Sequence, residues 1–153
     1  MKQKECITQA ISILKSNKYL TLATTDGVLP WVAPVYYCLD EDYNFYFISQ
    51  LESVHVKHIL QKPNVAFAIF DSHQPEGEGN GVQGSGTVTL LQGDAMLEGL
   101  NYYSTSFIDI KPEYLVESAP YRLFKITPEH FYVLDADAEV DKRVEVFIHK
   151  KNK

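Results

Sequence analysis

The sequence has few of the features that mark secreted, zinc-binding, membrane-spanning or nucleic-acid-binding proteins. Its two cysteines, Cys6 and Cys38, show no CxxC or Cys/His spacing, so we expect two reduced thiols and no zinc. The longest uninterrupted apolar run is Val65 to Phe70, far short of the roughly 18 to 20 residues of a membrane helix. The net charge is -6 and the only notable basic cluster lies at residues 150–153, which argues against a nucleic-acid partner.

Signatures of common catalytic classes are also absent. The sequence contains no GxSxG nucleophile motif, no GxxxxGK[ST] phosphate loop, no HExxH zinc motif and no dinucleotide fingerprint between a strand and a helix. A hydrolase that depends on an activated nucleophile is therefore not expected.

What remains is the composition of a globular domain. Of 153 residues, 45% are hydrophobic and 22% charged, which suffices to bury a core without disulfides or metals. The first five residues include three charged ones and lead into no long apolar stretch, unlike a signal peptide, so we expect a cytoplasmic protein. We expect a single domain over residues 1–153.

Apolar periodicity predicts a helix followed mainly by strands. Residues 4–16 place Ile7, Ala10 and Leu14 on one face at helical spacing. Later segments are rich in β-branched and aromatic residues and are bounded by turn signals, including one at Pro128-Glu129. We expect about seven strands from these segments, whose eight candidate ranges are residues 19–25, 31–39, 43–49, 65–70, 82–92, 121–127, 130–134 and 143–148.

Two further segments show helical patterns. Ser53 begins a short helix that Pro63 stops. Residues 94–118 are loosely helical, with apolar positions that include Phe107, and a turn or helix starts at Pro112.

Successive strands joined by short turns favour a mainly β, antiparallel fold, a six- to seven-stranded Greek-key barrel with a few flanking helices. Pro34 cannot donate a ladder hydrogen bond, so its strand should carry an edge or a bulge there. Gly84 and Gly86 lie inside a strand and indicate close backbone contact or strong curvature.

The junction from Phe47 to His58 is the first candidate ligand site. It places hydroxyls, histidines and a lysine between a strand and a helix, where free N–H groups and the helix dipole favour an anion such as phosphate. The alternative is structural: Ser53 caps the helix while His55, Lys57 and His58 face water.

Two strands form the second candidate. Residues 31–37 are largely aromatic or apolar, and residues 81–86 have very small side chains around Gln83, so a planar ring could lie against them. In the alternative, Trp31 and the tyrosines pack the barrel wall.

The order of these pieces resembles the FMN-binding split barrels related to pyridoxamine 5'-phosphate oxidase. The resemblance runs from about Tyr19 to Phe147. It rests on residues 19–24 with Pro30, 33–36, 46–49 with Ser53-Val-His55, 63–65, 70–72, 81–86, 121–126, 133–135 and 143–146.

The resemblance implies a homodimer with FMN at its interface, the phosphate near the third strand and the following helix, and the ring against the second and fifth strands. Ser49 falls where the family often has threonine, and Ser53 matches a serine. The implied cofactor-binding residues are Ala33, Pro34, Val35, Tyr36, Ile48, Ser49, Ser53, Val54, His55, Gln83, Gly84 and Arg143, the last reaching across from the second subunit unless it is a plain surface arginine.

Three departures from the family bear on function. His55 stands where a phosphate-binding lysine or arginine is common, so phosphate binding should weaken as the pH rises. Ala33 and Cys38 replace an arginine and a lysine of the true oxidase, and its Arg-x-His substrate pair is missing. Oxidation of pyridoxamine phosphate is therefore not expected.

The sequence thus predicts an FMN-dependent oxidoreductase of a small-molecule substrate, with the flavin carrying the redox chemistry. A flavin carrier or sensor without turnover is the alternative, and deazaflavin remains open for the same barrel. A third reading is haem binding, with axial ligands drawn from His55, His58, His73, His130 and His149.

Overall fold

A computed structural model describes residues 2–103 and 108–148 of the chain. In these residues the chain forms three α-helices, one 3-10 helix and eight strands. Their bounds are α1 Gln3–Ser16, β1 Tyr19–Thr25, β2 Pro30–Tyr36, β3 Cys38–Leu39, β4 Phe45–Gln50, α2 Val54–Gln61, β5 Asn64–Phe70, β6 Gly81–Leu90, α3 Gly93–Leu100, η1 Pro112–Leu115, β7 Tyr121–Leu134 and β8 Arg143–Val146.

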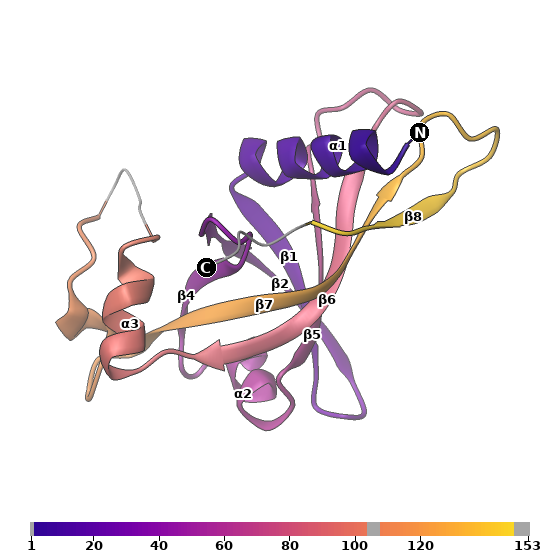
Figure 1. Cartoon of the computed structure of the whole chain (residues 1–153). Coiled ribbons are helices and arrows are strands. Elements are labelled where there is room, and N and C mark those ends of the chain that lie inside the picture. Colours follow the sequence, from indigo (N-terminus) through magenta and orange to yellow (C-terminus); the bar gives the residue numbers. More distant parts are fainter. Residues whose placement is uncertain (1, 104–107, 149–153) are drawn as a thin grey trace.

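All eight strands belong to one antiparallel sheet that curls into an incomplete barrel (Figure 1). Hydrogen bonds join them in the order β2, β1, β5, β6, β7, β4 and β3, and β8 pairs with β7. Strand β2, at one end of this order, contacts β4 near the other end, so the sheet nearly closes on itself. The predicted mainly β split-barrel fold with flanking helices is confirmed.

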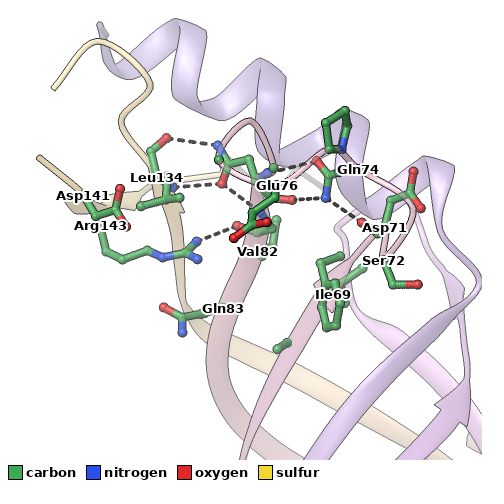
Figure 2. Close-up of a pocket in the computed structure, with 17 residues that line it drawn as sticks. Ile69, Asp71, Ser72, Gln74, Glu76, Val82, Gln83, Leu134, Asp141 and Arg143 are labelled. Atoms are coloured by element: carbon green, nitrogen blue, oxygen red, sulfur yellow. Dashed lines mark hydrogen bonds between the residues drawn. The ribbon is translucent and has the colours of Figure 1, made fainter. Parts of the chain in front are cut away.

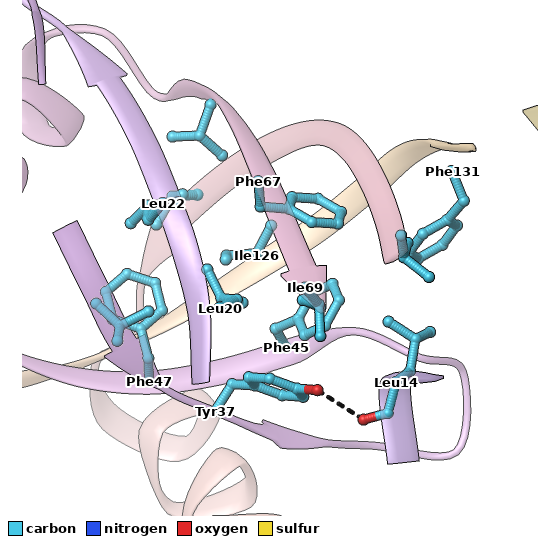
Figure 3. Packing of buried hydrophobic residues seen from close by; sticks show 14 of the residues in the cluster. Leu14, Leu20, Leu22, Tyr37, Phe45, Phe47, Phe67, Ile69, Ile126 and Phe131 are labelled. Carbon is cyan, nitrogen blue, oxygen red and sulfur yellow. Dashed lines mark hydrogen bonds between the residues drawn. The ribbon is translucent and has the colours of Figure 1, made fainter. Parts of the chain in front are cut away.

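Alternate residues of the strands fill the barrel with aromatic rings (Figure 3). Phe45, Phe47 and Phe124 are fully buried. Phe47 stacks on Phe124 with ring centroids 5.2 Å apart, and Phe45 meets Phe67 edge-on at 5.0 Å. This continuous aromatic core fixes which face of each strand points inward.

The helices cover different parts of the sheet. The apolar face of α1 lies against β5 to β8, while α2 packs against β1 and β2 and α3 against β7. The predicted helices at residues 4–16, after Ser53 and near residue 94 are confirmed, as is the one starting at Pro112. Phe107, which belonged to the pattern of residues 94–118, lies outside the described residues. No helix in residues 2–103 and 108–148 is long and apolar enough to cross a membrane.

The strand predicted at residues 31–39 is in fact two strands. Strand β2 ends at Tyr36, and Cys38 and Leu39 form the separate strand β3, which pairs with β4 instead of β1. Between them Tyr37 is buried, and its hydroxyl donates a 2.6 Å hydrogen bond to the Leu14 carbonyl. This anchor turns the chain from one side of the barrel to the other. Pro34 lies on the edge strand β2, as predicted.

The turn predicted at Pro128-Glu129 is wrong, because β7 runs unbroken from Tyr121 to Leu134. The register instead shifts: Gly86 pairs with Pro128 and Ser85 pairs with His130, which leaves Glu129 as a β-bulge. Proline has no N–H to give the ladder, and the bulge accommodates that loss.

The bulge also exchanges the two faces of β7. Before it, Phe124 and Ile126 point into the core, and after it Phe131 and Val133 do so. Because side chains alternate along a strand, His130 and Tyr132 are turned outward.

The strand glycines mark the closest approaches in the sheet, as predicted. A Cβ atom at Gly84 would lie 2.6 Å from the His130 carbonyl oxygen and would overlap the Phe67 ring, and one at Gly86 would strike the Thr127 carbonyl. Side chains at these positions would force β6 away from its neighbours.

Replacing Gly84 by alanine should therefore destabilise the fold by about 1–3 kcal/mol, the usual cost of overpacking a core. The midpoint and slope of urea unfolding measure this loss. Gly79→Ala is the matched control, because its new Cβ would meet Gln74 only at an ordinary 3.4 Å. Equal midpoints for both variants would contradict the close approach at β6.

Candidate functional site

Side chains of five neighbouring strands form a surface that points away from the barrel interior, which we call the outer face. One row across it consists of Pro34, Thr21, Ala68, Gln83 and Tyr132, successive partners on β2, β1, β5, β6 and β7. These residues alternate with buried core residues of the same strands, so their side chains lie outside the barrel.

A second row lies beside the first and consists of Val32, Ala23, Ala66, Ser85 and His130. The middle of both rows carries only small or slender side chains. A planar group can therefore approach the backbone of β1, β5 and β6 closely. Larger apolar side chains that are more than half exposed border this area, namely Tyr19, Val32 and Phe70.

The four predicted residues of β2 divide between the two faces. Pro34 is exposed and Tyr36 half-buried, whereas Ala33 and Val35 are buried in the barrel. Gly84 of β6 likewise faces the core, against Phe67. Ala33, Val35 and Gly84 can therefore offer a ligand only backbone groups, while Pro34 and Tyr36 can offer side chains.

The predicted phosphate residues come together where β4 ends and α2 begins. The Nε2 atom of His55 lies 2.8 Å from the Oγ atom of Ser49, which is itself buried. Ser53 is the N-cap residue of α2, but its hydroxyl donates to the Gln50 carbonyl at 2.7 Å and does not cap the helix. The first N–H groups of α2, including that of Val54, thus have no side-chain cap and stay available to an anion.

Burial sets the charge of the histidine in this junction. The pKa of His55 is lowered from its ordinary value of 6.5, first by burial and then by the neighbouring His58. His58 is held by Thr24, with Nδ1 and Oγ1 3.0 Å apart. At neutral pH and without a ligand, His55 is therefore a neutral hydrogen-bonding group and not a fixed cation.

The positively charged side chains near this junction are engaged by other groups of the protein. Lys57 forms an exposed ion pair with Glu52 at 3.1 Å. Arg122 is the direct cross-strand partner of Ser49, but its guanidinium donates to the carbonyls of Glu117, Ala119 and Tyr121. Hydroxyls, backbone N–H groups and imidazole therefore make up the anion-binding groups that this junction offers.

Gln83 and Arg143 line one pocket of about 660 Å³ at the other end of the sheet (Figure 2). Arg143 donates a 2.8 Å hydrogen bond from a terminal nitrogen to the Gly81 carbonyl, which holds its side chain against its own chain. Asp71, Glu76 and Asp141 also line this pocket. The negative charge of these carboxylates makes the pocket a poor site for a phosphate group.

A second pocket of about 610 Å³ lies where residues 108–121 meet β4. Ile48 forms part of its wall, and so does Tyr103, whose ring contacts that of Tyr36 with centroids 5.8 Å apart. Burial raises the pKa of Tyr103 to about 12, so its hydroxyl stays protonated. This pocket was not predicted, because the sequence of this region follows no single period.

Within the single chain the predicted ring contacts do not converge on one point. Strands β2 and β6 are separated by β1 and β5, which places Pro34 and Gln83 about 14 Å apart at roughly 4.8 Å per strand. The junction of Ser49 and His55 belongs with β2, because α2 packs against that strand. Gln83 and Arg143 form a separate group.

Comparison with models of known families matches residues 8–135 to pyridoxamine 5'-phosphate oxidase. The chain belongs to this family. The resemblance read from the sequence motifs is confirmed by this match. The chain is also 30% identical over 108 residues to UPF0306 proteins of Yersinia pestis and Yersinia pseudotuberculosis, which covers 70% of this chain and 71% of theirs.

Solved structures share the fold at low sequence identity. A heme binding protein from Mycobacterium smegmatis superimposes with a TM-score of 0.72 and 15% identity over 91% of this chain, which spans only 57% of that protein. An FAD-binding protein from Mesorhizobium loti gives a TM-score of 0.59 and 17% identity over 82% of this chain and 91% of the other. These similarities establish the split barrel and no particular ligand.

The substrate site expected from the family takes a different form in this chain. Strand β8 carries Arg143-Val144-Glu145, so a carboxylate lies two positions after this arginine, and the chain contains no Arg-x-His pair. In the described part of the chain, no group of three or more His, Cys, Asp or Glu residues could hold a metal ion. The outward position of His130 was also not predicted; Pro128 inside a strand was the signal that could have revealed the bulge.

His55 should make stability depend on pH. Its pKa is lower in the folded than in the unfolded chain, so the unfolded state binds more protons near pH 6 and stability falls as the pH drops below about 6.5. His55→Gln should remove part of this fall, measured as the free energy of urea unfolding at pH 7.5 and 5.5. His73→Gln, at a side chain 93% exposed, is the control and should keep the wild-type slope.

Proposed function

We propose that this protein is a cytoplasmic homodimeric flavoprotein that binds FMN at the subunit interface and acts as an oxidoreductase on a small-molecule substrate. The observation that carries the proposal is the outer face: a flat area of small side chains with an uncapped helix start and the Ser49–His55 pair at one end and Gln83 at the other. Family membership and the FAD-binding neighbour support it.

The residues of the junction fit an FMN phosphate by their donor chemistry. The hydroxyl of Ser49 and the first N–H groups of α2 would donate to phosphate oxygens, and Ser53 would join them once its hydroxyl turns away from the Gln50 carbonyl. His55 would donate from a ring nitrogen and would gain a proton as the phosphate approaches, since a dianion favours the charged imidazole. Binding should therefore strengthen as the pH falls from 8 towards 6.5.

The flavin ring would lie against β2, apart from the groups that hold the phosphate. Pro34 and Tyr36 of β2 would border it through their side chains, and Ala33 and Val35 through their backbone. Bound FMN would supply the transfer of a hydride or of single electrons. The chain's own contribution is to hold and orient it and to exclude water from one side of the ring.

The spacing of the strands supports a dimer. Since one ring cannot span the distance from β2 to β6 in one subunit, Gln83 would reach the ring bound to the other subunit. A two-fold interface makes this exchange reciprocal, so one pairing completes both sites. Large exposed apolar side chains on the β1–β2 hairpin and on α2 would be covered there, namely Val28, Leu29, Trp31, Val32, Val54 and Leu60.

Pyridoxamine phosphate is not the substrate in this proposal. Glu145 lies two positions after Arg143, and Asp71, Glu76 and Asp141 line the pocket that contains Arg143. Carboxylates there would repel a second phosphate ester.

The test is FMN titration of the untagged protein, followed by flavin fluorescence and by the visible spectrum. Wild-type protein should quench FMN fluorescence, and Ser49→Ala and His55→Ala should each weaken binding about tenfold, the effect of one lost charge-assisted hydrogen bond. Ser12→Ala, at an exposed position of α1, is the matched control. A protein without flavin affinity would refute the proposal, and a Soret band in the purified protein would indicate haem in its place.

Shared sites can be tested with mixed dimers. His55→Ala and Gln83→Ala chains, each weak in FMN binding as homodimers, should form hybrids with one doubly defective and one intact site. Titration of purified hybrids, each chain carrying a different tag, should then find one tight FMN per dimer. If each FMN were held by a single chain, both sites of the hybrid would be defective and no tight site would be found.

A further inference from the structure

The outer face carries one fixed pair of titratable side chains that the proposed flavin site does not use. The Nδ1 atom of His130 on β7 lies 2.6 Å from the Oε1 atom of Glu145 on β8. The two side chains are 49% and 31% exposed, so the pair is open to solvent and to ligands. It links two strands and belongs to no turn or helix cap.

Both members of the pair are positioned by the fold. The bulge at Glu129 turns His130 outward and places it opposite Ser85 in the second row of the outer face. Gln3 of α1 clamps β8 beside Glu145, since its Nε2 atom donates to the Glu145 carbonyl and its Oε1 atom accepts from the N–H of Phe147. The His130 ring also stacks near Tyr132, with centroids 6.3 Å apart.

This geometry leaves one ring nitrogen available. A carboxylate can only accept, so Nδ1 of His130 carries the proton and Nε2 of the neutral ring has the free lone pair. In residues 2–103 and 108–148 no group bonds to Nε2. An imidazole held at one nitrogen by a carboxylate, with the other nitrogen free, can take up and return a proton without changing its orientation.

The charges around the pair restrict its ligand. Glu145 and Glu129 are both acidic, Glu129 being held by the Thr87 hydroxyl at 2.7 Å, and Tyr132 is the other titratable group beside the ring. Arg143, the cation on β8, is engaged by the Gly81 carbonyl. An anionic substrate is therefore disfavoured, and an uncharged compound that takes up a proton together with electrons suits the site better.

We propose that His130, oriented by Glu145, is the proton donor and acceptor for an uncharged quinone-type substrate at the interface. The proposal rests on the proposed flavin function. Because His130 lies on the strand next to Gln83, it would accompany Gln83 to the ring held by the other subunit. Glu145 acts as a positioning residue and does not touch the substrate.

A quinone gains two electrons and one proton as a hydride from reduced flavin, and its second proton comes from Nε2 of protonated His130. The products are the hydroquinone, oxidised flavin and neutral His130, which water then reprotonates. In the reverse direction the neutral ring accepts the hydroxyl proton of the hydroquinone.

The kinetic test is anaerobic reoxidation of the FMN-loaded, dithionite-reduced dimer by menadione, followed by the return of flavin absorbance. His130→Ala should slow the step about 100-fold, and added imidazole should restore much of it. Glu145→Gln should lower the limiting rate without changing the half-saturating menadione concentration. His73→Ala, another exposed histidine beside a carboxylate, should behave as wild type.

A second measurement does not depend on turnover. Diethyl pyrocarbonate acylates accessible neutral histidines, and peptide mass spectrometry reports the rate at each one. FMN loading should slow the acylation of His130 but not that of His73, because only His130 faces the bound ring.

The outcomes separate this proposal from the proposed function. If the wild-type protein binds no FMN, both the proposed function and the role of His130 are refuted. If FMN binds, a wild-type reoxidation rate in His130→Ala, a failure of imidazole to accelerate that variant, or an unprotected His130 would each overturn the role of His130 alone.

Discussion

The close approach of β6 to its two neighbours is the contact on which the barrel depends. Gly84 lets the Phe67 ring reach the backbone of β6, and Gly86 lets β7 come equally near. Without these contacts the sheet could not curl tightly enough for Phe45 of β4 to meet the Phe67 ring of β5, since β6 and β7 lie between those two strands. The sheet can curve here because Gly84 and Gly86 have no side chains, and the aromatic core fills the interior of the curved sheet.

The same strands determine what the outside of the barrel offers. In the middle of β1 and β5, large apolar residues that point inward alternate with small residues that point outward, so the two strands present a flat surface over a tightly packed interior. On β7 this alternation would have continued to the wrong face, and the bulge at Glu129 corrects it. A single extra residue thereby keeps Phe131 and Val133 in the core and places His130 beside Ser85.

Most of the fold could be predicted because period and turn chemistry are local. The helix of residues 4–16 and the strand of residues 19–25 follow directly from their patterns, and Pro34 indicated that its strand lies at an edge of the sheet or carries a bulge. The break at Tyr37 could not be predicted, because it depends on a hydrogen bond to Leu14 from a distant part of the chain. In the candidate site, the family resemblance assigned Ser49 and His55 to one phosphate site, and the structure brings the two side chains within hydrogen-bond distance. The sequence could not show that Ala33 and Val35 face inward or that Gln83 belongs to a separate group, since both depend on strand register.

The position of β7 between β6 and β4 has a consequence for synthesis of the protein. These two strands are finished long before residues 121–134 leave the ribosome, yet each needs β7 as its partner. The nascent chain must therefore carry two unpaired edges and an open core until its last third emerges. Closure then comes in one late step, and β8 and the clamp from Gln3 can form only after it. Truncation within the last third would leave a chain with no stable partial barrel and a strong tendency to aggregate.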